Sequence, residues 1–179
     1  MSFCSALALS RAEKVSMKAE TLNYKTFRKQ RSTRLKNFDY SKPFAYFITI
    51  CTQERQPHYA NPAVARVVMD TIREIGSNYG YKIYSFCVMP DHLHILVSPS
   101  DSGTSLPKFM QILKSKIAVL ILKQTGINQL WQKSYYEHIL RKSEDLLETV
   151  NYILHNPVRK GLVEDYHEYA FCGVLDEFE

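Results

Sequence analysis

Cysteine is scarce in this 179-residue chain, and its four cysteines form no C-x-x-C pair. That absence speaks against the common zinc-binding and dithiol motifs built on such a spacing. Cys51 and Cys87 lie inside apolar, strand-like runs, where cysteine behaves as a small hydrophobic residue. We therefore expect reduced, structural cysteines and a cytoplasmic protein.

Long apolar runs are also lacking. The longest, Ile117 to Leu122, is far too short to cross a bilayer. The opening run from Phe3 to Leu9 is followed, not preceded, by basic residues, which is the wrong order for a signal peptide. We expect no membrane partner. With 45% hydrophobic and 23% charged residues, the chain has the composition of an ordinary globular protein with one core.

Positive charge is concentrated near the start of the chain. Residues 1–42 hold ten Lys or Arg against three Asp or Glu, whereas the remainder holds 13 against 15. We therefore divide the chain into a basic N-terminal extension, residues 1–42, and a domain, residues 43–179. Aromatic residues such as Phe27 and Tyr40 accompany the basic ones. The predicted DNA contacts of this segment are Arg28, Lys29, Arg31, Arg34 and Lys36.

A basic run with interleaved aromatic residues suits a nucleic-acid backbone, because cations release counterions and aromatic faces stack on unpaired bases. A solvated tail explains the same composition equally well.

Hydrophobic periodicity predicts a β-α-β-β-α-β order after residue 43. Two of its helices have clear ends, with Asn61-Pro62 opening the first and Gly126 stopping the second. Expected strands are residues 44–52, 81–88, 92–98 and one between 132 and 140; expected helices follow Asn61 and Ser105. This order is the ferredoxin-like α+β arrangement, an antiparallel sheet with both helices on one face. The other face is then available for a site.

Within the third strand, His92-Leu93-His94 places two imidazoles around one aliphatic residue. Side chains alternate across a strand, so both histidines project from one face while Leu93 enters the core on the other. Neutral imidazole is the commonest protein metal ligand. The pattern therefore indicates a candidate metal site on a rigid support.

A last helix follows the sheet, capped by Ser143 and ending before Pro157. Its expected apolar stripe is Leu146, Leu147, Val150, Ile153 and Leu154. Tyr152 and Asn156 are four residues apart, hence on one side of the helix and off that stripe. A phenol and a carboxamide are thereby held together.

The segments Met89–His94 and Tyr152–Val163 resemble the HUH motif (histidine, hydrophobic residue, histidine) and the tyrosine helix of single-tyrosine insertion-sequence transposases. The Tyr-Ile-x-x-Asn-Pro-Val-Arg-x-Gly-Leu-Val pattern, with Trp131-Gln132 and Tyr135-Tyr136 upstream, is most similar to the REP-associated tyrosine transposases. Residues 39–53 resemble the first strand of that family. The likeness spans about residues 28 to 165.

The resemblance implies a metal-dependent nuclease that acts on single-stranded or hairpin DNA. It assigns His92, His94 and Asn156 as metal ligands and Tyr152 as the nucleophile of a 5′-phosphotyrosine intermediate. Insertion-sequence members typically carry Gln at the third ligand position, and Asn matches the REP-associated group. Both a homodimer and a monomer remain open.

Two imidazoles and one amide oxygen suit Mg²⁺ or Mn²⁺, with phosphate oxygens completing the ligand shell. His155 lies about a hundred degrees around the helix from Asn156, so we leave it out of this shell. Candidate contacts to the DNA backbone are Lys114 and Lys116 on the second helix, and Arg159 and Lys160 after the tyrosine helix. Solvated helix faces explain these cations about as well.

Two other functions compete with strand transfer. One is a hairpin-binding regulator on the same scaffold that no longer cleaves DNA. The other is a metal-dependent hydrolase that uses activated water, in which Tyr152→Phe leaves substantial turnover. The chain lacks the H-x-E and P-C-x-x-C ligands of a zinc deaminase.

Overall fold

The computed structural model describes residues 39–177 except 41–43, 102 and 141–143. Contacts within the chain divide it into residues 1–31 and 32–179, and the first unit lies wholly outside the described residues. The prediction of DNA contacts at Arg28, Lys29, Arg31, Arg34 and Lys36 also lies outside them.

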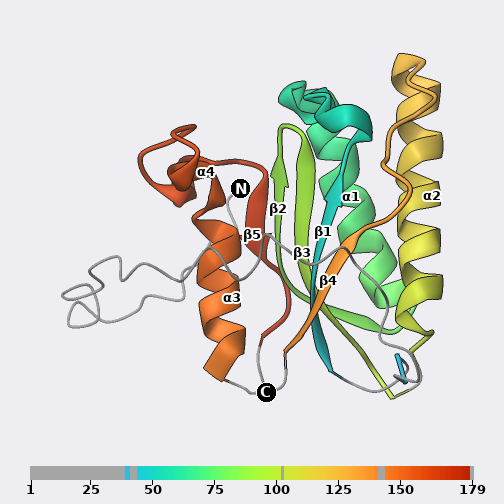
Figure 1. Ribbon diagram of the computed structural model, residues 1–179, viewed down its shortest axis with the longest axis vertical. Helices are drawn as coiled ribbons and strands as arrows, with labels where there is room; N and C mark the ends of the chain where they lie inside the picture. Colours follow the sequence, from blue (N-terminus) through green and yellow to red (C-terminus); the bar gives the residue numbers. More distant parts are fainter. Residues whose placement is uncertain (1–38, 41–43, 102, 141–143, 178–179) are drawn as a thin grey trace, which may run out of the picture. The chain divides into compact units, whose positions relative to one another are not determined.

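One five-stranded antiparallel sheet, in the order β4-β1-β3-β2-β5, forms the centre of the second unit (Figure 1). Its strands are β1 (Ala45–Cys51), β2 (Tyr81–Met89), β3 (His92–Pro99), β4 (Tyr136–Leu140) and β5 (Cys172–Val174). The tight turn at Pro90-Asp91 makes β2 and β3 antiparallel neighbours, as predicted from the short link. The first four strands have the ferredoxin-like arrangement that the sequence predicts.

Helices cover both faces of this sheet. They are α1 (Pro62–Asn78), α2 (Leu106–Thr125), α3 (Glu144–Leu154) and the short α4 (Asn156–Arg159), with 3-10 turns at Gln53–Arg55, His58–Ala60 and Tyr166–Glu168. Figure 1 shows α1 and α2 on one side of the sheet and α3 on the other. No helix in the described ranges is long and apolar enough to cross a membrane.

The main core lies between the sheet and the α1/α2 layer. Ile48 and Ile95 project into it from neighbouring strands, and Leu113 meets them from α2, all three fully buried. Tyr81 stacks on Phe109 with ring centroids 3.8 Å apart. Because α3 covers the opposite face, every residue of β3 is buried, including its polar ones.

Local signals explain where the helices begin and end. The side chain of Asn61 accepts a hydrogen bond from the Ala63 N–H at the start of α1, as expected of a cap. Gly126 closes α2 with φ of 78°, a conformation that favours glycine. Ser105 occupies the N-cap position of α2, but its hydroxyl makes no capping hydrogen bond.

Three features differ from the sequence prediction. Strand β5 was not expected, because its three residues are too few to show the alternation of apolar and polar side chains that predicts a strand. Leu120 is 37% exposed, since the buried stripe of α2 follows Leu113, Ile117 and Ile121 instead. Leu147 is 59% exposed, whereas Val150, Ile153 and Leu154 of the same predicted stripe are buried.

Two leucines of α2, one buried and one exposed, provide a test of this core. We expect Leu113→Ala to lower the free energy of unfolding by about 2–5 kcal/mol, because it leaves a cavity between helix and sheet. Leu120→Ala makes the same chemical change on the outer face and should cost less than about 1.5 kcal/mol. Urea denaturation of both variants measures the difference, and equal losses would contradict the assigned stripe.

Candidate active site

A row of five side chains crosses the sheet on the face toward α3. The strand registers pair Tyr136 with Thr49, Thr49 with His94, His94 with Cys87, and Cys87 with Cys172. Directly paired residues of antiparallel strands project from the same face. Residues from all five strands therefore meet along one line, with a histidine on the central strand.

The His94 imidazole of this row lies edge to face with that of His92, two residues earlier on β3. The Nε2 atoms of His92 and His94 are 3.1 Å apart, and each residue is 6% exposed. The Nδ1 atom of His92 lies 2.5 Å from the Asp91 carboxylate, and that of His94 lies 2.8 Å from the Thr49 hydroxyl. Each ring is thus held by its second nitrogen, which is the usual support of a metal-binding histidine.

Hydrogen-bond chemistry determines which nitrogens carry protons here. A carboxylate only accepts, so the Nδ1–H of His92 donates to Asp91 and its Nε2 is an acceptor. A neutral His94 then donates its Nε2–H to His92 and accepts at Nδ1 from the Thr49 hydroxyl. One chain of hydrogen bonds therefore runs from Thr49 through both imidazoles to Asp91.

Burial keeps both imidazoles neutral. It lowers the pKa of His94 well below its usual 6.5, and the charges of His92, Arg159 and Arg55 lower that pKa further, while a hydrogen bond with Asn156 raises it. Burial is also the main reason for the lowered pKa of His92, against the raising effect of Asp91. A neutral ring is the form that binds a metal ion.

The tyrosine predicted as nucleophile lies next to these rings in the same chain. The half-buried ring of Tyr152 has its centroid 6.0 Å from that of His94 and 5.7 Å from that of Phe47. The guanidinium carbon of Arg159 lies 3.9 Å from the centre of the Tyr152 ring, within the range of a cation–π contact. The charge of Tyr152 is among the causes that raise the pKa of Tyr136, after burial.

Asn156 lies one turn after the tyrosine, is 5% exposed and interacts with His94. Its amide nitrogen donates to the backbone carbonyls of Tyr152, at 3.0 Å, and Ile153, at 3.3 Å. These bonds fix the carboxamide and leave its oxygen as the acceptor for other partners. The two histidines, Tyr152 and Asn156 are therefore brought together as the sequence predicts.

A break between α3 and α4 gives Asn156 this position. His155 separates the two helices, and Pro157 lies in the first turn of α4, where the missing N–H costs nothing. The exposed His155 ring has other partners, since its Nδ1 lies 2.8 Å from the Asn151 carbonyl oxygen and its ring packs on Tyr166. Its exclusion from the ligand set agrees with this placement.

Arg55 is a cationic neighbour that the sequence did not reveal. Its guanidinium forms an ion pair with Asp91 at 2.9 Å, so one carboxylate contacts both Arg55 and His92. Glu54 and Arg55 have φ of 51° and 54°, a left-handed conformation that costs non-glycine residues about 1–3 kcal/mol each. Thr52 supports this segment, since its hydroxyl lies 2.8 Å from the Asp91 carbonyl oxygen.

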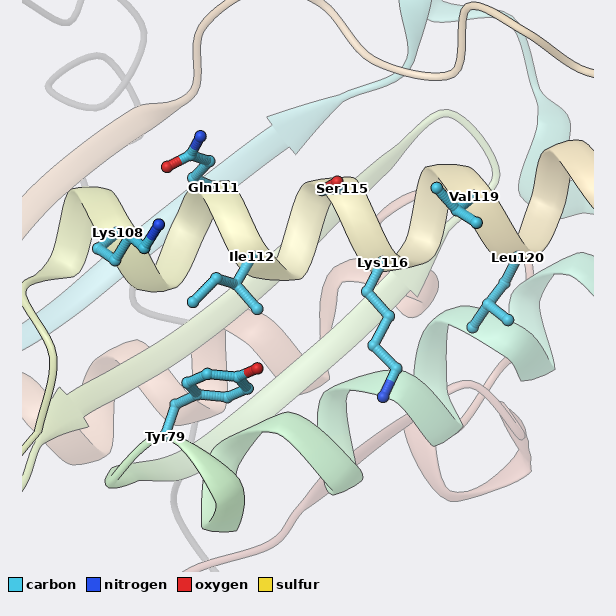
Figure 2. Close-up of a pocket in the computed structure, with 8 residues that line it drawn as sticks. All are labelled: Tyr79, Lys108, Gln111, Ile112, Ser115, Lys116, Val119 and Leu120. Atoms are coloured by element: carbon cyan, nitrogen blue, oxygen red, sulfur yellow. The ribbon is translucent and has the colours of Figure 1, made fainter.

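Lys114 and Lys116 lie on α2, across the sheet from the imidazoles. Lys114 donates to the Gln132 carbonyl at 2.8 Å, and burial lowers its pKa. Lys116 reaches toward α1 beside an open groove of about 440 Å³ (Figure 2) and pairs with Glu74. The structure thus gives both lysines partners within the protein, away from the candidate site, whereas Arg159 and Lys160 are exposed next to it.

Comparison with known proteins assigns a family to this arrangement. Residues 41–156 match the family described as IS200-like transposases. The chain is 25% identical over 145 residues to a Haemophilus influenzae protein classed as a REP-associated tyrosine transposase, covering 75% of this chain and 82% of that one. It is 21% identical over 132 residues to the REP-associated tyrosine transposase of Escherichia coli K12, covering 74% and 77%.

A solved structure of a REP-associated tyrosine transposase bound to a REP hairpin has the same fold. The TM-score is 0.65 at 21% sequence identity, and the match covers 75% of this chain and 79% of the other.

The buried imidazoles predict how stability depends on pH. Folding lowers the pKa of His94, so the stability that its neutral ring contributes is fully present above about pH 6.5, the pKa in the unfolded chain. That stability is lost as the pH falls below this value. In chelator-treated protein, we expect the urea midpoint to fall between pH 7 and pH 5. His94→Gln should flatten this fall, whereas the exposed His138→Gln should not; an unchanged profile in His94→Gln would contradict the assignment.

Proposed function

Since this chain belongs to the family of IS200-like transposases, we propose that it cuts and rejoins a DNA strand with Tyr152 as nucleophile. The observation that carries the proposal is the distance of 6.0 Å between the ring centroids of Tyr152 and His94. The family membership itself establishes only a function related to DNA transposition.

A divalent cation is the group that the two imidazoles fit. Two ligand atoms at right angles and about 2.1 Å from one ion are about 3.0 Å apart, and the Nε2 atoms of His92 and His94 are 3.1 Å apart. In the described part of the chain, no three His, Cys, Asp or Glu side chains gather as a metal site. We propose the Asn156 oxygen as the third protein ligand, supported by its burial and its interaction with His94, which gives the mixed set suited to Mg²⁺ or Mn²⁺.

When bound, the cation would polarise the scissile phosphate and offset the charge that develops in the transition state. To hold the ion, both Nε2 atoms would have to offer lone pairs, so the proton of His94 would be on Nδ1 and the Thr49 hydroxyl would accept a hydrogen bond from it. Asp91 keeps His92 in the required form throughout.

The proposed reaction is a phosphoryl transfer without loss of bond energy. The Tyr152 oxygen attacks the phosphorus, the bond to the 3′ oxygen breaks, and the phenolic proton is balanced by the proton that the leaving oxygen gains. The products are a 5′-phosphotyrosyl strand and a free 3′-hydroxyl. Attack by another 3′-hydroxyl reverses the steps and reseals the DNA.

Cations around Tyr152 support the orientation of both reactants. Arg159 lies over the phenol ring, which restricts its rotation, and Lys160 follows at the exposed end of α4. Arg55 lies near the imidazoles, whose pKa values its charge lowers, and is paired with Asp91. A phosphate that binds Arg55 competes with Asp91 for the guanidinium, so DNA binding and the orientation of His92 are linked through one carboxylate.

The proposed partner is a DNA hairpin or an unpaired strand next to one. The support is the solved relative that is bound to a REP hairpin. Among the described residues, Arg159 and Lys160 are the proposed contacts to the DNA backbone. We leave out Lys114 and Lys116, because they already bind the Gln132 carbonyl and Glu74. The basic residues from Arg28 to Lys36 stay a prediction.

Covalent capture on a labelled hairpin oligonucleotide tests the nucleophile. Wild-type protein with Mn²⁺ should leave a denaturant-resistant adduct, and Tyr152→Phe should leave none above background. Tyr136→Phe, on the same sheet face, is the matched control and should retain the adduct. An adduct in Tyr152→Phe would contradict the assignment, cleavage without any adduct would favour activated water, and hairpin binding without cleavage would favour the regulator.

Thermal unfolding with added Mn²⁺ tests the ligand set without DNA. We expect Mn²⁺ to raise the unfolding temperature, since an ion bound only to the folded state stabilises it. Asn156→Ala should reduce this rise and His94→Gln should remove it. Asn151→Ala, an exposed position in the preceding helix, should behave as wild type. An equal rise in all variants would place the ion elsewhere.

A further inference from the structure

Two cysteines face each other at the edge of the sheet. Cys87 of β2 is directly paired with Cys172 of β5. The Val88 N–H donates to the Phe171 carbonyl at 2.8 Å, so the adjacent pair, Cys87 and Cys172, is a non-hydrogen-bonded pair. In such pairs the Cα atoms lie about 4.5 Å apart and the side chains come closest. That spacing falls within the Cα range of disulfides, about 4.4–6.8 Å.

Their surroundings differ in a way that matters for reactivity. Cys87 is fully buried, whereas Cys172 is half-buried. The Cys87 sulfur lies 3.5 Å from the Met89 sulfur, and the Cys172 sulfur lies 3.5 Å from the Tyr169 carbonyl oxygen. Interaction between the two thiols is the main cause of the raised pKa of Cys87 and of the lowered pKa of Cys172. Cys172 is therefore the thiol with access to small reagents and the stronger tendency to ionise.

We propose that Cys87 and Cys172 form a dithiol site that closes into an intramolecular disulfide by exchange with a low-molecular-weight disulfide. The Cys172 sulfur attacks the reagent, forms a mixed disulfide and releases the first reagent thiol. Cys87 then attacks the Cys172 sulfur and releases the second. Two electrons pass from the protein sulfurs to the reagent, and the two thiol protons leave with its two thiols.

The bond would fix the segment that follows the tyrosine helix. β5 pairs with the sheet over only three residues. The Tyr169 hydroxyl donates to the Val88 carbonyl at 2.8 Å, and Tyr166 packs on His155 between α3 and α4, with ring centroids 4.8 Å apart. A covalent link at Cys172 therefore holds the chain that packs behind the helix break.

Cys51 provides an internal control. It is half-buried on the same sheet face, but it is paired with His92, not with a cysteine. It can form a mixed disulfide with a small reagent, but it has no cysteine opposite it to complete an intramolecular bond.

Mass spectrometry of the full chain treated with oxidised glutathione tests the proposal. After alkylation and digestion, we expect Cys87 and Cys172 in one cross-linked peptide pair lighter by two hydrogens, in protein that stays monomeric on a non-reducing gel. Dithiothreitol should restore both thiols. A stable glutathione adduct on Cys172 without the cross-link, or no reaction at either thiol while Cys51 reacts, would overturn it.

Thermal unfolding gives a second readout that does not depend on activity. Oxidation should raise the unfolding temperature by several degrees, because the bond closes a long loop in the unfolded chain. Cys172→Ser, a conservative change at the half-buried position, should unfold like the reduced protein and show no such rise. A rise of the same size in oxidised Cys172→Ser would assign the effect to another thiol.

Discussion

Alternation along β3 is the constraint on which the rest of the site depends. Leu93 and Ile95 enter the core under α1 and α2, and this burial fixes the strand in register between β1 and β2. His92 and His94 must then project into the layer under α3. A slip of one residue would exchange the two faces, and it would put both imidazoles into the apolar core.

Two neutral rings on that face need partners, and the neighbouring strands supply them. The register of β1 places Thr49 against His94, and the turn before β3 places Asp91 against His92. Desolvation and these hydrogen bonds act together, because burial alone would leave ring nitrogens unsatisfied. The same row continues from His94 to Cys87 and Cys172, so the proposed dithiol and one of the two imidazoles share one line of the sheet.

Periodicity was enough to predict the central elements. A period of two placed His92 and His94 together. A spacing of four brought Tyr152 and Asn156 close, but the prediction of one helix for both was wrong, because α3 ends at Leu154 and Asn156 begins α4. Thr49 and Tyr136 join the site through strand register across distant segments, which no local pattern contains. Arg55 depends on two left-handed residues that sequence preferences disfavour, and Leu120 lies only slightly off the buried stripe. These features are set by tertiary contacts, so local reasoning could not supply them.

The Tyr152 ring contacts Phe47 and lies beside His94 of its own chain. The imidazoles and the phenol named in the proposed reaction therefore lie together within one copy of the chain. A site assembled in this way would form on folding, to an extent that does not depend on protein concentration.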